Sequence, residues 1–241
     1  VLEGSKSQVL EQVKKLKSIK KLEEDAREKF LLRAAKQSFY NTSPMDLSKL
    51  EKCDDPDVSL EQYPTSGELA ARWIFDIAAF GDLLDGASVL DLGAGNGILG
   101  IGALQLGADK AILVDSDSRC CEVSRRNAES YVGPKSYEVL ETDVSTLDSN
   151  LGHIDLIISN PPWGRQKEKA DAPFLDLIES IGAVTHIMHS SNAKHIRPRF
   201  EEAGWGVEMY GEADFAIPAS FEHHRSSRGV TKAGFWRLTP P

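Results

Sequence analysis

Residues 89–97, which read VLDLGAGNG, constrain the fold of this chain more than any other part of its 241-residue sequence. An apolar run reaches an aspartate, and three glycines then alternate with other residues before a new apolar segment begins. Glycines in such a turn permit positive φ and let a ligand approach the backbone at the start of the following helix. The stretch therefore predicts a strand, a cofactor-binding turn and a helix, the opening unit of an α/β sheet.

Strand and helix patterns alternate along the rest of the chain. Short apolar runs that are each followed by a helical pattern indicate parallel strands with crossover helices. The expected strands are 88–92, 111–115, 137–142, 154–159, 184–189, 205–217 and 229–238. The expected helices are 66–80, 98–106, 118–131, 173–181 and 192–203. We expect an α/β fold with a mostly parallel seven-stranded sheet that ends in an antiparallel hairpin, because the last two strands follow one another without a helix.

The N-terminal part differs from the rest in charge. Residues 1–44 contain ten Lys and Arg against six Asp and Glu, so the other residues hold 18 against 31 and a net charge of −13. Apolar residues recur every three or four positions over 6–37, which predicts a helix. We expect a helical extension at 1–44 and one domain at 45–241. Because the chain begins without methionine, Met45 is a candidate natural start, and residues 1–5 are candidate non-native ones.

Composition excludes several classes of protein. Hydrophobic residues make up 41% and charged residues 27%, as in folded globular chains. No stretch approaches the roughly 20 apolar residues that span a bilayer, and neither end resembles a secretion signal. Of the three cysteines, Cys120 and Cys121 are adjacent and cannot easily bridge each other, so we expect reduced thiols. A cytoplasmic protein with no membrane partner is expected.

Three aspartates mark the ends of the first three strands. The glycines also satisfy a dinucleotide fingerprint, but Asp91 precedes them, where a carboxylate would repel a pyrophosphate and attract the amino group of S-adenosylmethionine. Asp115 is placed to accept hydrogen bonds from ribose hydroxyls, and Asp143 from an adenine amino group or, alternatively, to cap the strand end. The predicted cofactor is S-adenosylmethionine, and its predicted contacts are Asp91, Gly93, Gly95, Asn96, Gly97, Asp115, Asp143, Val144 and Asn160.

The tetrapeptide Asn160-Pro161-Pro162-Trp163 follows the fourth strand. Two prolines fix the backbone and remove two N–H donors, which leaves carbonyl acceptors at the cleft. An adenine amino group is a poor nucleophile because its lone pair is delocalised. If Asn160 and the Pro161 carbonyl accept its two hydrogens, the lone pair can turn toward a methyl donor while Trp163 stacks on the base. These four residues are the predicted catalytic set.

Together, Asp91-x-Gly93-x-Gly95 and Asn160-Pro-Pro-Trp163 resemble the class I, Rossmann-like amino-methyltransferases. Residues 60–65, which read LEQYPT, make the chain similar to the methyltransferase-like 5 type of rRNA adenine-N6 methyltransferases of archaea and eukaryotes. The resemblance covers about residues 45–238. It implies methylation of small-subunit rRNA, a small zinc-binding activator protein as partner, and cofactor contacts from Gln62, Tyr63, Pro64 and Thr65. Trp163 stands where the family usually has phenylalanine.

The resemblance also implies an RNA-binding cluster near the C-terminal hairpin. Its basic residues here are His223, His224, Arg225, Arg228 and Lys232. Such a local patch is needed because the body of the chain is acidic and has no general attraction for phosphates.

Other interpretations remain open. Methylation of a protein glutamine would meet the same problem of a planar amide nitrogen, and a non-catalytic module could hold the cofactor as a structural ligand. A dehydrogenase is disfavoured by the proline loop. His186 and His189 lie three apart on a strand, so they face opposite sides and form no metal pair. No catalytic metal is predicted.

Overall fold

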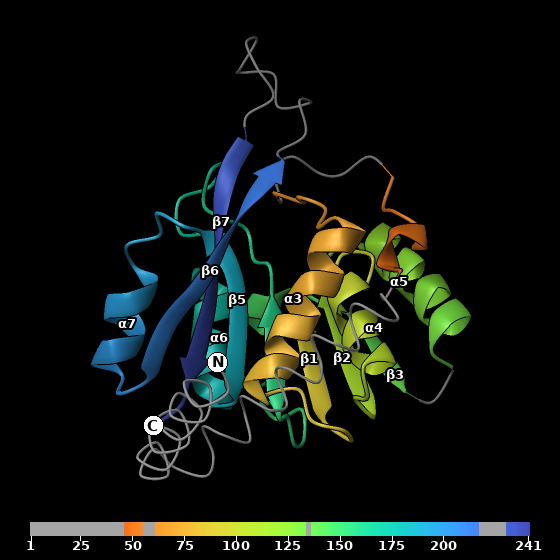
Figure 1. The fold of residues 1–241 in the computed structure, drawn as a ribbon, viewed down its shortest axis with the longest axis horizontal. Coiled ribbons are helices and arrows are strands. Elements are labelled where there is room, and N and C mark those ends of the chain that lie inside the picture. The colour runs from red at the N-terminus through yellow and green to blue at the C-terminus, as the bar shows by residue number, and fades with distance from the viewer. Residues whose placement is uncertain (1–45, 55–60, 134–135, 217–229) are drawn as a thin grey trace, which may run out of the picture.

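The computed structural model describes residues 46–54, 61–133, 136–216 and 230–241. A seven-stranded sheet in the order β3-β2-β1-β4-β5-β7-β6 crosses the molecule (Figure 1). Five strands are parallel and the last two antiparallel. They are β1 (Ser88–Leu92), β2 (Lys110–Asp115), β3 (Tyr137–Glu141), β4 (Leu156–Ser159), β5 (Val184–Ser190), β6 (Gly206–Ala216) and β7 (Val230–Thr239). The predicted Rossmann-like sheet with a C-terminal hairpin is confirmed. The predicted extension at 1–44 lies outside the described residues.

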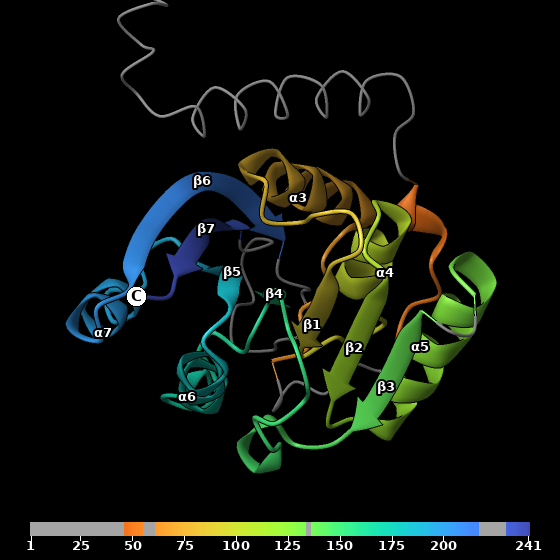
Figure 2. The same cartoon turned by 90° about the horizontal axis from the view of Figure 1, so that it is seen from below.

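Helices cover both faces of the sheet. They are α3 (Gly67–Phe80), α4 (Ile98–Gln105), α5 (Ser118–Tyr131), α6 (Ala172–Ile181) and α7 (Ile196–Glu202), with short 3-10 turns η2 (Leu47–Lys49) and η4 (Val144–Thr146). Figure 2 shows α3 and α4 on one side of the sheet and α6 on the other. Successive residues of β1 alternate between the two layers, so that Val89 packs in the core under α3 and α4 whereas Leu90 packs in the core beside α6.

Local signals explain where the helices begin and end. The Ser66 hydroxyl accepts the N–H of Leu69 and caps α3, and Gly81 ends that helix in the left-handed conformation. The expected helix 192–203 is wrong at its start, because α7 begins only at Ile196. Proline is tolerated in the first turn of a helix, where its missing N–H costs nothing, and Pro198 occupies that turn.

The expectation of reduced cysteines is also wrong for two of them. A disulfide joins Cys53 to Cys120, whose Cα atoms are 5.3 Å apart, and only Cys121 is a free cysteine among the described residues. The two cysteines are 67 residues apart, so no local sequence pattern predicted that they would meet. The bond fixes the segment after η2 to the first turn of α5.

The strand order places the site. β1 pairs with β2 on one side and with β4 on the other, so the order of crossovers reverses at β1. Ligands of open α/β sheets bind beyond the carboxyl ends of strands at such a reversal. Asp91 on β1, Asp115 at the end of β2 and Asn160 after β4 share this edge.

Candidate active site

The glycine turn is built as a ligand-binding surface. Gly97 has φ 82° as the N-cap of α4, and a side chain there would collide with the Ser124 hydroxyl at 2.7 Å. Gly95, with φ 55°, faces open space, since an added Cβ would meet no atom within 4 Å. A Cβ on Gly93 would lie 3.9 Å from the Asn160 carbonyl oxygen, so the turn and the proline loop are neighbours.

Asp91 is fully buried below this turn. The N–H of Gly100 donates to its Oδ2 at 2.8 Å, while Oδ1 has no hydrogen-bond partner among the described residues. Burial raises the pKa of Asp91 to about 7, with a contribution from the charge of Asp115. A buried carboxylate with an unsatisfied oxygen is a suitable partner for an ammonium group, as the predicted role requires.

The other two aspartates are already engaged by the backbone. Asp115 accepts the Gly95 N–H at Oδ2 (2.8 Å) and the Asp117 N–H at Oδ1 (2.9 Å), and burial raises its pKa. Asp143 accepts the hydroxyl and the N–H of Ser145, which lower its pKa, and it caps η4. The capping alternative therefore describes Asp143 in this structure, and its contact with adenine stays a prediction, as does that of Val144.

The loop after β4 presents Asn160 in a defined orientation. Its Nδ2 donates to the Thr65 hydroxyl at 3.3 Å, and its Oδ1 accepts the indole N–H of Trp163 at 3.1 Å. The two contacts distinguish the amide nitrogen from the amide oxygen. The oxygen keeps a second lone pair for a substrate hydrogen.

Glu61 is a site residue that the sequence analysis missed. Its side chain is 4% exposed, and its two carboxylate oxygens accept the N–H groups of Trp163 (2.7 Å) and Gln166 (2.6 Å). Its φ of 53° is unusual for a residue with a side chain. Glu61 thereby holds the proline loop against the segment that contains Gln62 to Thr65. Its position directly before that segment was the available signal.

Two further contacts hold the segment 62–65 in place. Gln62 Nε2 donates to Asp117 Oδ2 at 3.0 Å, and Tyr63 meets Trp163 edge to face with ring centroids 6.3 Å apart. Pro64 is exposed beside them. The amide of Asn96, a predicted cofactor contact, instead donates to the Glu51 carbonyl at 2.8 Å. The structure thus brings together most of the predicted cofactor and catalytic residues at one edge.

Trp163 is 7% exposed and lies among aromatic rings. Phe215 lies 5.0 Å away between centroids, and His189 stacks on the indole at 5.9 Å with 25° between the planes. The ring is therefore rigidly supported, and its stacking on a base stays a prediction. As predicted, His186 and His189 face opposite sides, since His186 contacts Asp82 at 2.9 Å in the other layer.

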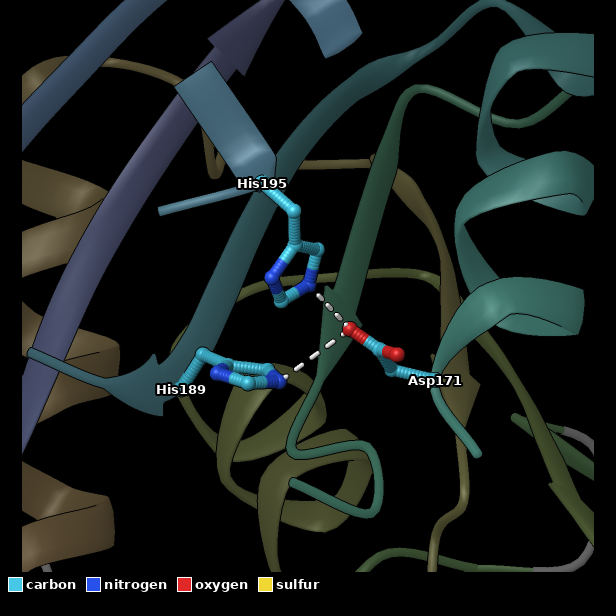
Figure 3. A group of neighbouring side chains, drawn as sticks. All are labelled: Asp171, His189 and His195. Carbon is cyan, nitrogen blue, oxygen red and sulfur yellow. Dashed lines mark hydrogen bonds and ion pairs between the residues drawn. The ribbon is translucent and has the colours of Figure 1, made fainter. Parts of the chain in front are cut away.

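His189 belongs instead to a cluster with Asp171 and His195. Figure 3 shows both imidazoles directed at the Asp171 carboxylate, with Nε2 to Oδ2 distances of 3.2 Å for His189 and 2.5 Å for His195. Burial alone would raise the pKa of Asp171, but these two contacts outweigh it and lower the pKa.

Two histidines and one aspartate are a donor set that a metal ion could use. The N–H of Ser190, however, donates to Nδ1 of His189 at 2.8 Å. A neutral imidazole that accepts at Nδ1 carries its proton on Nε2, so no lone pair points toward Asp171. His189 Nε2 forms no hydrogen bond of good geometry with a described residue. Its tautomer nevertheless places an N–H, and not a lone pair, beside the Asp171 carboxylate, which disfavours a cation site.

Of the predicted RNA-binding cluster, the structure describes only Lys232. His223, His224, Arg225 and Arg228 lie outside the described residues. Lys232 is exposed on β7, 3.7 Å from the carboxylate of Glu212. Among the helices that the structure describes, none is long and apolar enough to cross a membrane.

The residues present fit S-adenosylmethionine. The unsatisfied Asp91 oxygen suits its ammonium group, the open face of Gly95 leaves room beside the turn, and Asp115 retains lone pairs for hydroxyls. With the sheet order and the Asn-Pro-Pro-Trp loop, these features define a class I, Rossmann-like methyltransferase whose cofactor is S-adenosylmethionine.

Comparison with known proteins narrows the class. Residues 79–186 match the methyltransferase small domain family. The chain is 30% identical over 207 residues to the zebrafish (Danio rerio) rRNA N(6)-adenosine-methyltransferase METTL5, which covers 81% of this chain and 100% of the relative. The corresponding Caenorhabditis elegans enzyme is 29% identical over 74% of this chain and 87% of its own length.

A solved structure agrees. The crystal structure of a candidate RNA methyltransferase from Pyrococcus horikoshii superposes with a TM-score of 0.69 at 32% identity, over 80% of this chain and 95% of that one. The chain belongs to the METTL5 family of methyltransferases.

Proposed function

We propose that this protein transfers a methyl group from S-adenosylmethionine to the N6 amino group of an adenosine in rRNA, and that this rRNA is that of the small subunit. Membership in the METTL5 family supports the substrate class. The observation that carries the proposal is the orientation of the Asn160 amide, whose oxygen side is set by the indole of Trp163 and whose nitrogen side is set by Thr65.

The cofactor, when bound, supplies an electrophilic methyl group on a sulfonium. Asn160 Oδ1 and the Pro161 carbonyl each accept one N6 hydrogen, so that the amino group leaves the plane of the ring and its lone pair becomes available. Transfer would form the bond from N6 to the methyl carbon and break the methyl–sulfur bond, whose electron pair stays on the departing neutral thioether, and the surplus N6 proton would pass to water. Positioning therefore provides most of the rate enhancement, and no strong base is needed.

The test uses purified protein, methyl-labelled cofactor and total rRNA from cells that lack the protein. We expect label in N6-methyladenosine of the small-subunit rRNA, and its near-complete loss with Asn160→Ala. Asn150→Ala is the matched control, because Asn150 is an exposed loop residue outside the site.

Three outcomes would contradict the proposal. Full activity of Asn160→Ala removes the mechanism. Label in protein in place of RNA selects the glutamine methyltransferase. Cofactor binding without turnover on any rRNA selects the non-catalytic module.

Two finer predictions accompany this proposal. Family resemblance supports a small zinc-binding activator protein as partner, which co-purification of the full chain from its native cells would test. We also propose action in the cytoplasm, on the ground that the proposed substrate is rRNA, and cell fractionation would test this. Recovery of the protein alone, or in another compartment, would contradict them.

A further inference from the structure

About half of the described basic side chains of this acidic protein are paired with carboxylates. Of the described Lys and Arg residues, eight form ion pairs with carboxylates: Lys49, Lys110, Arg119, Arg126, Arg197, Arg199, Lys232 and Arg237. Seven form no ion pair with a described residue: Lys52, Arg72, Arg125, Arg165, Lys167, Lys169 and Lys194. Three of these seven fall within the five residues 165–169, directly after the proline loop.

This short segment is held at its inner side by backbone contacts. Glu61 accepts the Gln166 N–H, and the carbonyls of Lys167 and Lys169 accept the N–H groups of Ala170 and Ala172 at 3.1 Å each. All five side chains from Arg165 to Lys169 are exposed. The backbone is thus fixed while the cationic side chains remain in solvent.

Arg165 connects the segment to the predicted base-stacking residue. Its guanidinium carbon lies 6.0 Å from the centroid of Trp163, and its Nη2 donates to the Thr231 hydroxyl on β7 at 2.8 Å. This hydrogen bond orients the guanidinium without neutralising its charge. The remaining donors of Arg165 are available for an anion.

The contrast between paired and unpaired cations has an electrostatic consequence. A net-acidic body repels a polyanion, whereas unpaired cations beside a cleft attract it locally. Glu168 is the only acidic residue among 165–169, so the segment has a net charge of +2. Phosphate contacts position a nucleic acid strand, while the base pocket selects the base.

We propose that Arg165, Lys167 and Lys169 form a phosphate-binding rim that holds the RNA strand next to the adenosine at Trp163. The inference rests on the proposed function and adds to it a surface for the sugar-phosphate backbone. It is distinct from the basic cluster at 223–232.

Lys167 also interacts with Asp143, so the test must separate an effect on the cofactor from an effect on RNA binding. Its charge contributes to the lowered pKa of Asp143, a predicted cofactor contact. A variant at Lys167 could therefore act through the cofactor. Measuring cofactor affinity in parallel distinguishes that effect from a loss of RNA contacts.

The test compares Lys167→Gln/Lys169→Gln with Lys49→Gln/Lys110→Gln. Both double variants remove two positive charges from exposed lysines, but Lys49 and Lys110 are paired with Asp46 and Glu138 outside the site. Thermal unfolding checks that each variant is folded. Methyl transfer to total rRNA gives KM and kcat, and calorimetry gives the Kd of S-adenosylmethionine.

For the rim variant we expect the KM for rRNA to rise about tenfold, with the cofactor Kd unchanged. The dependence of the logarithm of RNA affinity on the logarithm of salt concentration should become shallower by about 1.4, for two single-strand phosphate contacts. The control variant should change neither value. The same salt series uses a single-stranded oligoribonucleotide, so it works even without turnover.

The outcomes separate the two proposals. If the unaltered protein methylates rRNA but the rim variant matches the control in KM and salt slope, the rim is refuted and the function stands. If the cofactor Kd rises and accounts for the loss, the rim is again refuted. If the unaltered protein methylates no rRNA, the proposed function fails, and the oligoribonucleotide series alone decides whether the rim binds phosphates.

Discussion

The two halves of the site are held in different ways. In the cofactor half, Asp91, Asp115 and Asp143 each accept a backbone N–H from a residue at most 20 positions away. In the substrate half, Asn160 and Trp163 are held by side chains that are about 100 residues away in the sequence, namely Thr65 and Glu61. The comparison teaches that the three aspartates of the cofactor half are held by contacts that are local in the sequence, whereas the substrate half forms only when distant segments have packed.

A consequence is that changes in the two halves should affect different kinetic constants. Variants of the substrate half should lower kcat with little effect on cofactor affinity. Variants of the cofactor half should weaken cofactor binding. A single variant that lowers kcat and also weakens cofactor binding would contradict this separation of the two halves.

The largest effect is expected for Asn160→Ala. Loss of an oriented acceptor of this kind reduces kcat by about 100-fold to 1000-fold. Single-turnover assays should show this loss with a cofactor Kd within about threefold of that of the unaltered protein, since the aspartates still bind the donor. A large loss of cofactor affinity would assign Asn160 mainly to the cofactor half.

The second-largest loss of kcat is expected for Glu61→Ala. This substitution leaves the buried N–H of Trp163 without its acceptor, at a cost of about 1–3 kcal/mol, and frees the part-buried N–H of Gln166, so the loop can shift and kcat should fall about 50-fold. Glu61→Gln retains one acceptor oxygen and should recover part of this activity. If Glu61→Gln loses as much kcat and as much thermal stability as Glu61→Ala, Glu61 has a structural role only.

The substitution Asp91→Asn tests the cofactor half through its effect on cofactor affinity. Removing the charge that faces the ammonium should raise the cofactor Kd about twentyfold at pH 8. Since the pKa of Asp91 is about 7, cofactor affinity of the unaltered protein should weaken as the pH falls below 7, and the variant should lose this dependence. Calorimetry across pH 5.5–8.5, a range of about three units around that pKa, measures both.

Asp91 also predicts a stability effect of opposite sign. Its folded-state pKa lies above the unfolded value of 3.8, so its contribution to the cofactor-free stability is complete below pH 3.8 and is lost as the pH rises through about 7. Above pH 7 the cofactor-free Asp91→Asn variant should therefore unfold at a higher temperature than the unaltered protein. A lower unfolding temperature would contradict the burial of an unpaired carboxylate.

Trp163→Phe should have the smallest effect. It keeps an aromatic plate but removes the N–H that orients Asn160, a neutral hydrogen bond of about 1 kcal/mol, so kcat should fall about fivefold. The cofactor Kd should not change. An unchanged kcat would show that Thr65 alone orients the amide.

The same contrast explains what the sequence could predict. The strands, the parallel direction of the first five and the glycine turn follow from patterns that span a few residues, so their prediction succeeded. The start of α7 failed because Pro198 was interpreted as a break within a longer helix, although it occupies a first turn.

Long-range contacts were out of reach. Nothing near Glu61 in the sequence shows that its carboxylate meets the N–H groups of residues 163 and 166, and nothing near Cys53 shows Cys120. Strand alternation correctly separated His186 from His189. It could not show that His189 joins Asp171 and His195, which come from different elements.

The Glu61 carboxylate joins the segment with the predicted cofactor contacts at 62–65 to the proline loop with the predicted substrate contacts at 160–163. Because one residue holds both segments, a shift of either segment on binding of one reactant would be passed to the other, and we expect the binding of the two reactants to be coupled. By the same coupling, loss of one product is expected to weaken the binding of the other.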